Sequence, residues 1–278
     1  MRLLVCSTPD VASVNLRDRL LEIADWKEEG RFQGRPCYLL NDLYLVTSDT
    51  LHLDLDHVDR LVNEATGVTV NEVVFLSKHR AASGTPTLTM HPIGNFGKAD
   101  HGGRERTLVP SSPAFLSGIL RELAIRGKEL PFQISYEVTH HGPYLEVPTT
   151  YVEIGSDESK WGHLGAATAL AEAILNWRAI DGPVVIGVGG GHYAPRFTEV
   201  TLTKKLNFGH MVAKHVLEAG GDEHILSSIA LAMKASGTDI AYVHKKSFSR
   251  PEARRIKDLI EGAGFRVLES ENLEDVQS

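Results

Sequence analysis

Histidines grouped with glycine, carboxylate and amide residues are the features of this sequence that could carry chemistry. Thirteen histidines are present among 278 residues, and several fall in polar, glycine-containing loops at the ends of predicted strands. Three segments stand out: residues 89–95 (TMHPIGN), 136–143 (YEVTHHGP) and 187–196 (GVGGGHYAPR). Because α/β proteins place their sites in loops at strand ends, we take these segments as the candidate site.

The second segment combines a carboxylate with two adjacent histidines. If residues 133–139 form a strand, His140 and His141 lie where that strand ends in a Gly-Pro turn. Neighbouring residues on a strand point to opposite faces, so at most one of these histidines enters a given pocket unless the turn redirects the other. With Glu137, such a histidine could act as a general base or as a zinc ligand oriented by a carboxylate. The alternative is a hydrogen-bonded turn histidine without chemistry.

The third segment has the glycines of a dinucleotide-binding fingerprint but not their spacing. His192 occupies the position of the last glycine, Pro195 stands where the helix should be starting, and no acidic residue closes the next strand. These departures exclude NAD binding. Gly189, Gly190 and Gly191 could instead form an anion nest, with His192 and Arg196 projecting beside it. The alternative is a flexible connection between strands.

Activated water is the hydrolytic chemistry that the remaining residues allow. The sequence has no GxSxG elbow, and Cys6 is interpreted as a small buried core residue. In the first segment His91 accompanies Asn95, a neutral donor suited to an oxyanion or a carbonyl. Zinc bound by histidine and carboxylate would lower the pKa of a water molecule to about 7 and polarise a carbonyl. No HExxH motif is present, so a zinc site must be assembled from separate loops.

The net charge of −7 argues against a protein that coats nucleic acid non-specifically. Residues 244–257 nevertheless carry six Lys or Arg against one Glu. This segment is either a solvated helix or a strip that contacts phosphates. Its candidate RNA contacts are Lys245, Lys246, Arg250, Arg254 and Arg255.

The composition is that of an ordinary globular protein, with 42% hydrophobic residues. The two cysteines are far apart, so a disulfide framework is not indicated. No apolar run is long enough for a signal peptide or a membrane helix. We therefore expect a cytoplasmic protein that does not enter a membrane.

Short β-like runs alternate with helical patterns along the whole chain, which predicts an α/β fold with a mixed sheet. Strands are predicted over residues 2–7, 36–40, 43–47, 72–77, 132–138, 149–154, 183–188, 240–243 and 265–268. Helices are predicted over residues 55–65, 113–127, 222–234 and 250–262 and near 208–219. A further helix is predicted to start at Pro9, with Thr8 as its N-cap. Another is predicted to start at residue 157 or 159 and to bury a stripe of Leu164, Ala167, Ala171 and Ile174. Since we find no linker and no internal repeat, we expect residues 1–278 to form a single domain.

Several unusual strings in this order resemble the archaeal and plant-type D-aminoacyl-tRNA deacylases. They are STPDVASVNLRDRLLE, HPIGN, THHGP, GVGGGHYAPRFT and NFGHM, and the likeness spans nearly the whole chain. The resemblance implies hydrolysis of the ester between a D-amino acid and the 3′ adenosine of tRNA. This reaction removes D-amino acids from mischarged tRNA, which is chiral proofreading. It also implies zinc (Zn2+) and a three-layer α/β sandwich similar to phosphorylases and peptidyl-tRNA hydrolases. Its partner would be the acceptor end of D-aminoacyl-tRNA, with no role for DNA.

Site roles follow from placing that activity on these motifs. The metal ligands or catalytic base would come from His140, His141 and His192, with Glu137 and His91 as lesser candidates. Glycines 189–191, Asn95 and Arg196 would bind the terminal adenosine or stabilise the oxyanion. A rigid backbone wall would exclude one side-chain direction and so select chirality. The basic strip at 245–255 would hold the acceptor stem.

Two other functions remain open. One is a small-molecule hydrolase or phosphorylase, such as a peptidase or a nucleoside-cleaving enzyme, on the same scaffold. The other is a non-catalytic RNA-binding module whose histidines are structural.

Overall fold

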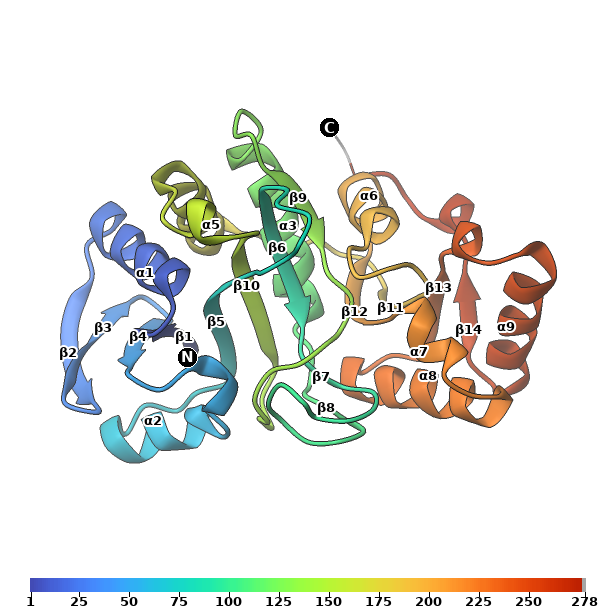
Figure 1. The fold of residues 1–278 in the computed structure, drawn as a ribbon, viewed down its shortest axis with the longest axis horizontal. Helices are drawn as coiled ribbons and strands as arrows, with labels where there is room; N and C mark the ends of the chain where they lie inside the picture. The colour runs from blue at the N-terminus through green and yellow to red at the C-terminus, as the bar shows by residue number, and fades with distance from the viewer. Residues whose placement is uncertain (277–278) are drawn as a thin grey trace.

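The structure is a computed structural model that describes residues 1–276 as two main β-sheets with helices packed against them (Figure 1). The strands are β1 (Arg2–Ser7), β2 (Lys27–Phe32), β3 (Arg35–Leu40), β4 (Leu43–Ser48), β5 (Glu72–Lys78), β6 (Thr87–Pro92), β7 (Gly94–Asn95), β8 (Thr107–Leu108), β9 (Gln133–Tyr136), β10 (Thr149–Gly155), β11 (Val184–Val188), β12 (Asn207–Val212), β13 (Ile240–Val243) and β14 (Arg266–Leu268). The helices are α1 (Val11–Ile23), α2 (Val58–Thr66), α3 (Pro113–Arg126), α4 (Glu158–Trp161), α5 (Leu164–Asn176), α6 (Pro195–Thr203), α7 (Lys214–Glu218), α8 (Asp222–Ser236) and α9 (Arg250–Gly262).

The larger sheet is mixed, as predicted. Its strand order is β2-β3-β4-β1-β5-β10-β6-β9. The central pairs β4/β1, β1/β5 and β5/β10 are parallel, whereas β10 pairs with β6 in antiparallel fashion. The central strands are buried along their length, which explains why their sequences are almost continuously apolar. The predicted hairpin at Asn41 and Asp42 joins β3 to β4, with Asn41 at a positive φ of 54°.

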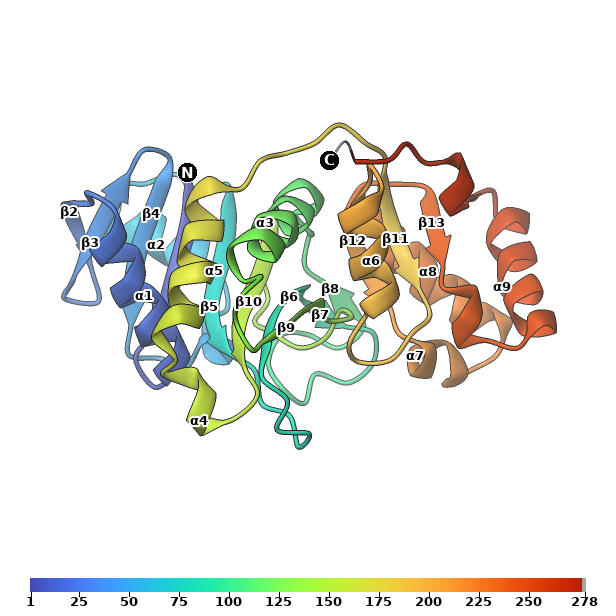
Figure 2. The ribbon, with the colours of Figure 1, turned by 90° about the horizontal axis from the view of Figure 1, so that it is seen from above.

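The smaller sheet is wholly parallel, with the order β12-β11-β13-β14. Helix α6 covers one of its faces and helices α8 and α9 cover the other (Figures 1 and 2). On the larger sheet, α1, α5 and α3 lie side by side on one face and α2 lies on the opposite face. The α/β class with a mixed sheet is therefore confirmed. The single domain stays a prediction, although one hydrophobic cluster contains side chains from both sheets, among them Val152 of β10 and Phe208 of β12.

Two helix predictions need correction at the N-terminal end. Helix α1 does not start at Thr8 and Pro9. It starts at Val11, because the buried carboxylate of Asp10 accepts the backbone N–H of Ser13 and caps the helix. In α5 the predicted stripe is buried at Ala167, Ala171 and Ile174, but Leu164 is 60% exposed because it lies at the first turn.

Residues 208–212 are a strand and not the start of a helix. The whole of β12 is buried and pairs with β11, so only residues 214–218 of the predicted helix are helical. Strands β2 and β6 and helix α6 were not predicted. Helix α6 begins at Pro195, contrary to the expectation that this proline opposes a helix, because proline suits the first helical position. The predicted capping box of Ser249 and Glu252 at the start of α9 is confirmed.

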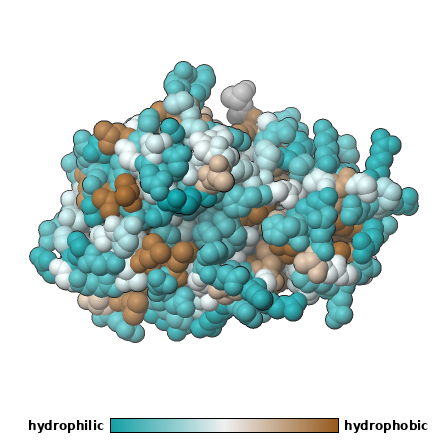
Figure 3. Space-filling model, viewed as in Figure 1, coloured by the Kyte–Doolittle hydropathy of each residue, from teal (hydrophilic) through white to brown (hydrophobic). Residues whose placement is uncertain are grey.

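The face seen in Figure 3 is mainly hydrophilic, with separate small hydrophobic groups. Among residues 1–276, no helix combines the length and the apolar character that a membrane crossing requires.

Candidate active site

Two buried glutamates lie at the centre of a histidine cluster in the larger sheet. The cluster is formed by residues on or directly after the neighbouring strands β5, β10, β6 and β9. Glu153 is on β10, His91 is on β6, and His79 directly follows β5. In the β10–β6 register, His91 lies opposite Tyr151. Glu153 is two residues from Tyr151 and so shares its face, which makes Glu153 and His91 diagonal neighbours.

His192 comes from the smaller sheet and enters the cluster by backbone pairing. Glu137 and Tyr193 form an antiparallel bridge. The N–H of Val138 donates to the carbonyl of His192 at 3.0 Å, and the N–H of Ala194 donates to the carbonyl of Tyr136 at 3.0 Å. The glycine-rich loop after β11 is therefore held against the segment after β9, which brings His192 to Glu137.

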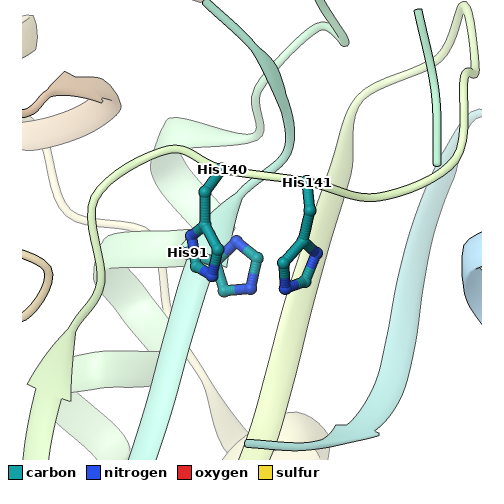
Figure 4. A group of neighbouring side chains, drawn as sticks. All are labelled: His91, His140 and His141. Atoms are coloured by element: carbon teal, nitrogen blue, oxygen red, sulfur yellow. The ribbon is translucent and has the colours of Figure 1, made fainter. Parts of the chain in front are cut away.

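The turn after β9 directs both of its histidines toward His91 (Figure 4). Strand β9 ends at Tyr136, so the alternation of a regular strand does not apply at residues 140 and 141. The ring centroids of His91 and His140 are 4.1 Å apart, and those of His140 and His141 are 4.2 Å apart. Gly142 supports this turn with a φ of +110°, a conformation that residues with a side chain rarely adopt.

Glu137 is fully buried and has histidines on both carboxylate oxygens. Its Oε1 lies 3.0 Å from Nδ1 of His79, and its Oε2 lies 3.0 Å from Nε2 of His192 and 3.4 Å from Nε2 of His140. Burial alone would raise the pKa of Glu137, but the contact with His192 and the nearby His91 and His79 bring it below its ordinary value.

Glu153 is also buried, and its Oε2 lies 3.6 Å from both Nδ1 of His79 and Nε2 of His91. Burial would raise the pKa of Glu153, but the contacts with His79 and His91 hold it well below its ordinary range. Its other oxygen, Oε1, accepts the hydroxyl of Ser77 at 2.9 Å. Both glutamates are thus carboxylates surrounded by histidine nitrogens.

Within residues 1–276, several of these atoms form no hydrogen bond of favourable geometry, although histidine nitrogens lie close to some of them. They are both carboxylate oxygens of Glu137, Oε2 of Glu153, Nε2 of His91 and Nδ1 of His141. Buried polar atoms are normally satisfied, so such a group marks a place where something else binds. Three sets of side chains hold their ligand atoms within 4.8 Å of one another and could bind a metal ion: His91, His140 and His141; His79, Glu137 and His192; and His91, Glu137 and Glu153.

Backbone carbonyls fix the tautomers of two of the histidines. Nδ1 of His140 lies 2.7 Å from the carbonyl oxygen of Val138, and Nδ1 of His91 lies 3.1 Å from that of Pro92. Because a carbonyl oxygen only accepts, each Nδ1 must be the donor. Burial, and then the charge of His91, lower the pKa of His140 to about 3, so His140 is neutral and its Nε2 carries a lone pair.

The cluster opens to a cavity of about 490 Å³. Four histidines of the cluster and one of its glutamates line it together with His52, His101, Lys78 and Arg80; they are His79, His140, His141, His192 and Glu153. His192 lies at its mouth, with 47% of its side chain exposed. The site therefore joins buried donor atoms to a space large enough for a ligand.

Other predicted binding residues lie outside the cluster. The amide of Asn95 donates to the carbonyl of Gly102 at 2.9 Å and so holds the loop after β7. The N–H of Gly189 donates to the carbonyl of Val212 at 2.8 Å, so this N–H is not available to an anion nest. Arg196 turns away with α6 and bonds the hydroxyls of Tyr242 and Ser270.

The predicted RNA-contacting strip is partly neutralised. Lys245 pairs with Glu269 at 2.7 Å, Arg254 lies 3.9 Å from Asp258, and Arg255 pairs with Asp222. Lys246 and Arg250 have no ion pair within residues 1–276.

Sequence reasoning missed His79 and Glu153. His79 follows the predicted strand 72–77 just as His140 follows the next candidate strand, and this position was the available signal. Glu153 is an acidic residue inside a β-branched strand that is otherwise apolar, which is costly unless the charge is paired.

A buried set of histidines and carboxylates open to a cavity defines a candidate hydrolytic metal centre. Residues 66–268 match the family model described as D-aminoacyl-tRNA deacylase, so the chain belongs to that family. D-aminoacyl-tRNA deacylase of Methanosarcina mazei is 37% identical over 98% of this chain and 93% of that protein. The protein of the same name from Archaeoglobus fulgidus is 35% identical over 98% of each chain. A crystal structure described as a conserved protein of unknown function superposes with a TM-score of 0.86 at 33% identity, covering 100% of this chain and 99% of that one.

Proposed function

We propose that this chain hydrolyses the ester between a D-amino acid and tRNA, using a water molecule activated by zinc at the histidine–glutamate cluster. Membership of the D-aminoacyl-tRNA deacylase family supports the reaction. The donor atoms of the cluster support the metal. The acceptor end of the tRNA would be the part bound, and the enzyme would act in the cytoplasm.

The contact between His140 and Glu137 is the observation that carries the metal proposal. The lone pair of His140 Nε2 faces a carboxylate oxygen of Glu137 at 3.4 Å, with no proton between the two acceptors. Two acceptors at this distance in a buried place repel one another unless a cation lies beside both. An Nδ1–H donated to a backbone carbonyl is also the usual orientation of a zinc-binding histidine.

The ligands would come from two adjoining groups. His91, His140 and His141 form one, and His79, Glu137 and His192 form the other. Zinc in such a site lowers the pKa of water to about 7 and polarises a carbonyl oxygen. His192, being the most exposed member of its group, is the one placed to meet the substrate.

The chain itself would hold and select the substrate. Lys78 and Arg80 line the cavity and would supply positive charge for the terminal nucleotide, with Arg80 also paired to Glu158. Backbone hydrogen bonds hold the 139–142 turn, so it presents a fixed wall that could exclude the L-amino acid by a clash. Lys246 and Arg250 would contact phosphates farther along the acceptor stem.

The test is release of amino acid from D-Tyr-tRNA and from L-Tyr-tRNA, with and without a chelator, together with the zinc content of the purified protein. His140→Ala should lose both activity and zinc. His163→Asn is the matched control, because His163 caps α5 through the N–H of Ala166, outside the cluster.

Release from the D form alone, abolished by chelator and restored by zinc, would support the whole proposal. D-selective release that ignores the chelator would retain the reaction but remove the zinc. Absence of release from either substrate would refute the reaction and favour hydrolysis of a small molecule.

A further inference from the structure

The turn at residues 139–142 lies between the cavity of the histidine–glutamate cluster and a second cavity. The second has a volume of about 280 Å³, against about 490 Å³ for the first. His140 and His141 line both cavities. A substrate whose reacting bond lies at these histidines therefore has a separate space on each side.

The two cavities differ in chemistry. Lys78 and Arg80 bring positive charge to the larger one, where Arg80 also pairs with Glu158 and the carboxylate of Glu153 forms part of the wall. Phe96, Val216 and Ala219 contribute apolar surface to the smaller one. Its lining also includes Lys98, His215 and His224, and no carboxylate is among the lining residues in the described chain. A nucleotide needs the larger volume of the first cavity, where Lys78 can meet its phosphate, whereas an amino-acid side chain suits the smaller volume and the apolar surface of Phe96 and Val216.

The wall between the cavities is fixed by backbone hydrogen bonds. The N–H of Thr139 donates to the carbonyl of Met211 at 3.0 Å, and the N–H of Gly94 donates to that of His141 at 3.0 Å. The hydroxyl oxygen of Thr139 also accepts the N–H of Met211 at 2.9 Å. The smaller cavity is thus formed before any ligand enters, as is usual for specific binding sites.

We propose that the smaller cavity receives the side chain of the amino acid, while the terminal nucleotide occupies the larger one. This inference rests on the proposed deacylase function and adds a specificity site to it. Gly97 and Ala219 line the smaller cavity from two separate segments, the loop after β7 and the residue that follows α7. They would set the largest side chain that the enzyme accepts.

Replacing Gly97 or Ala219 by a larger residue narrows the smaller cavity and so tests the proposal. Gly97→Phe is tolerable for the backbone because a Cβ there meets nothing within 4 Å, and Ala219→Trp replaces an exposed residue. Glu218→Trp is the matched control, since Glu218 is exposed beside Ala219 but does not line the cavity. Circular dichroism and thermal unfolding would establish that all three variants fold.

The measurement is kcat/KM for D-Tyr-tRNA and for D-Ala-tRNA. Each narrowing variant should lower the value for D-Tyr-tRNA about 10- to 100-fold, the loss expected when a large apolar group is no longer buried. D-Ala-tRNA should change less than about threefold, and Glu218→Trp should change neither.

Equal losses on both substrates would overturn the inference, because the cavity would then hold a part that they share. Unchanged values on both would also overturn it. If the wild-type enzyme releases neither amino acid, the proposed function itself fails, and this outcome is distinct from the other two.

Discussion

Acidification should destabilise this protein through His210, whose ring lies fully buried behind the 139–142 turn. Its Nε2 lies 2.8 Å from the carbonyl oxygen of Val109, so Nε2 donates and Nδ1 accepts the hydroxyl of Thr139 at 3.0 Å. Burial lowers the pKa of His210 to about 4. In the unfolded chain it returns to about 6.5, so the unfolded state binds more protons between these values and stability falls as the pH falls. Between pH 7 and pH 5 this single group costs about 2 kcal/mol of unfolding free energy.

The assay is urea unfolding of the wild type and of His210→Gln at several pH values. At pH 7 the variant should be less stable by about 1–3 kcal/mol, because the amide replaces the two hydrogen bonds imperfectly. That deficit should shrink by about 2 kcal/mol by pH 5, since glutamine does not titrate in this range. His215→Gln, at an exposed position, should keep the wild-type slope. Parallel curves for the wild type and His210→Gln would refute the argument.

Three further changes test the site and the fold. Glu137→Gln removes the buried charge between His79 and His192, so the rate of amino-acid release should fall about 10²- to 10⁴-fold and zinc affinity about 10- to 100-fold. Full activity of this variant would contradict the role assigned to the carboxylate. In Gly187→Ala the added Cβ would lie 2.6 Å from the ring of Phe197, so urea denaturation should show a loss of about 1–3 kcal/mol, and an unchanged midpoint would disprove the packing argument. Replacing Lys246 and Arg250 together by alanine should weaken tRNA binding and lower the slope of log K against log salt by about 2, whereas an unaltered slope would place the tRNA elsewhere.

The local pattern of apolar, capping and turn residues was sufficient to predict most of the helices and strands. It was not sufficient where pairing with a distant strand decides the structure. The capping box at Ser249 and the hairpin at Asn41 depend on neighbouring residues alone, and both were predictable. In residues 207–212, Phe208, Met211 and Val212 also fit a helical period, and pairing with β11 makes this segment a strand. Strand β2 is an exposed, charged edge strand without apolar alternation, so its sequence carried no signal.

The site was predictable where its residues were unusual in composition. His91, His140, His141 and His192 stood out beside glycine and proline and do meet in the structure. Glu153 could not be assigned because its partners depend on the register of β10 with its neighbouring strands, a non-local property. Arg196 was misplaced because the helix that carries it starts at Pro195 and turns its side chain toward Tyr242.

The pairing of residues 192–194 with 136–138 also has a consequence for synthesis, because the histidine–glutamate cluster is complete only after residues 192–194 have been translated. Glu137, Glu153 and the histidines at 79, 91, 140 and 141 are all translated before His192. A nascent chain that ends before the loop after β11 has both carboxylates but lacks His192, one of the three histidines that contact Glu137. On the proposed function, we therefore expect a chain truncated before residue 192 to release no amino acid from aminoacyl-tRNA.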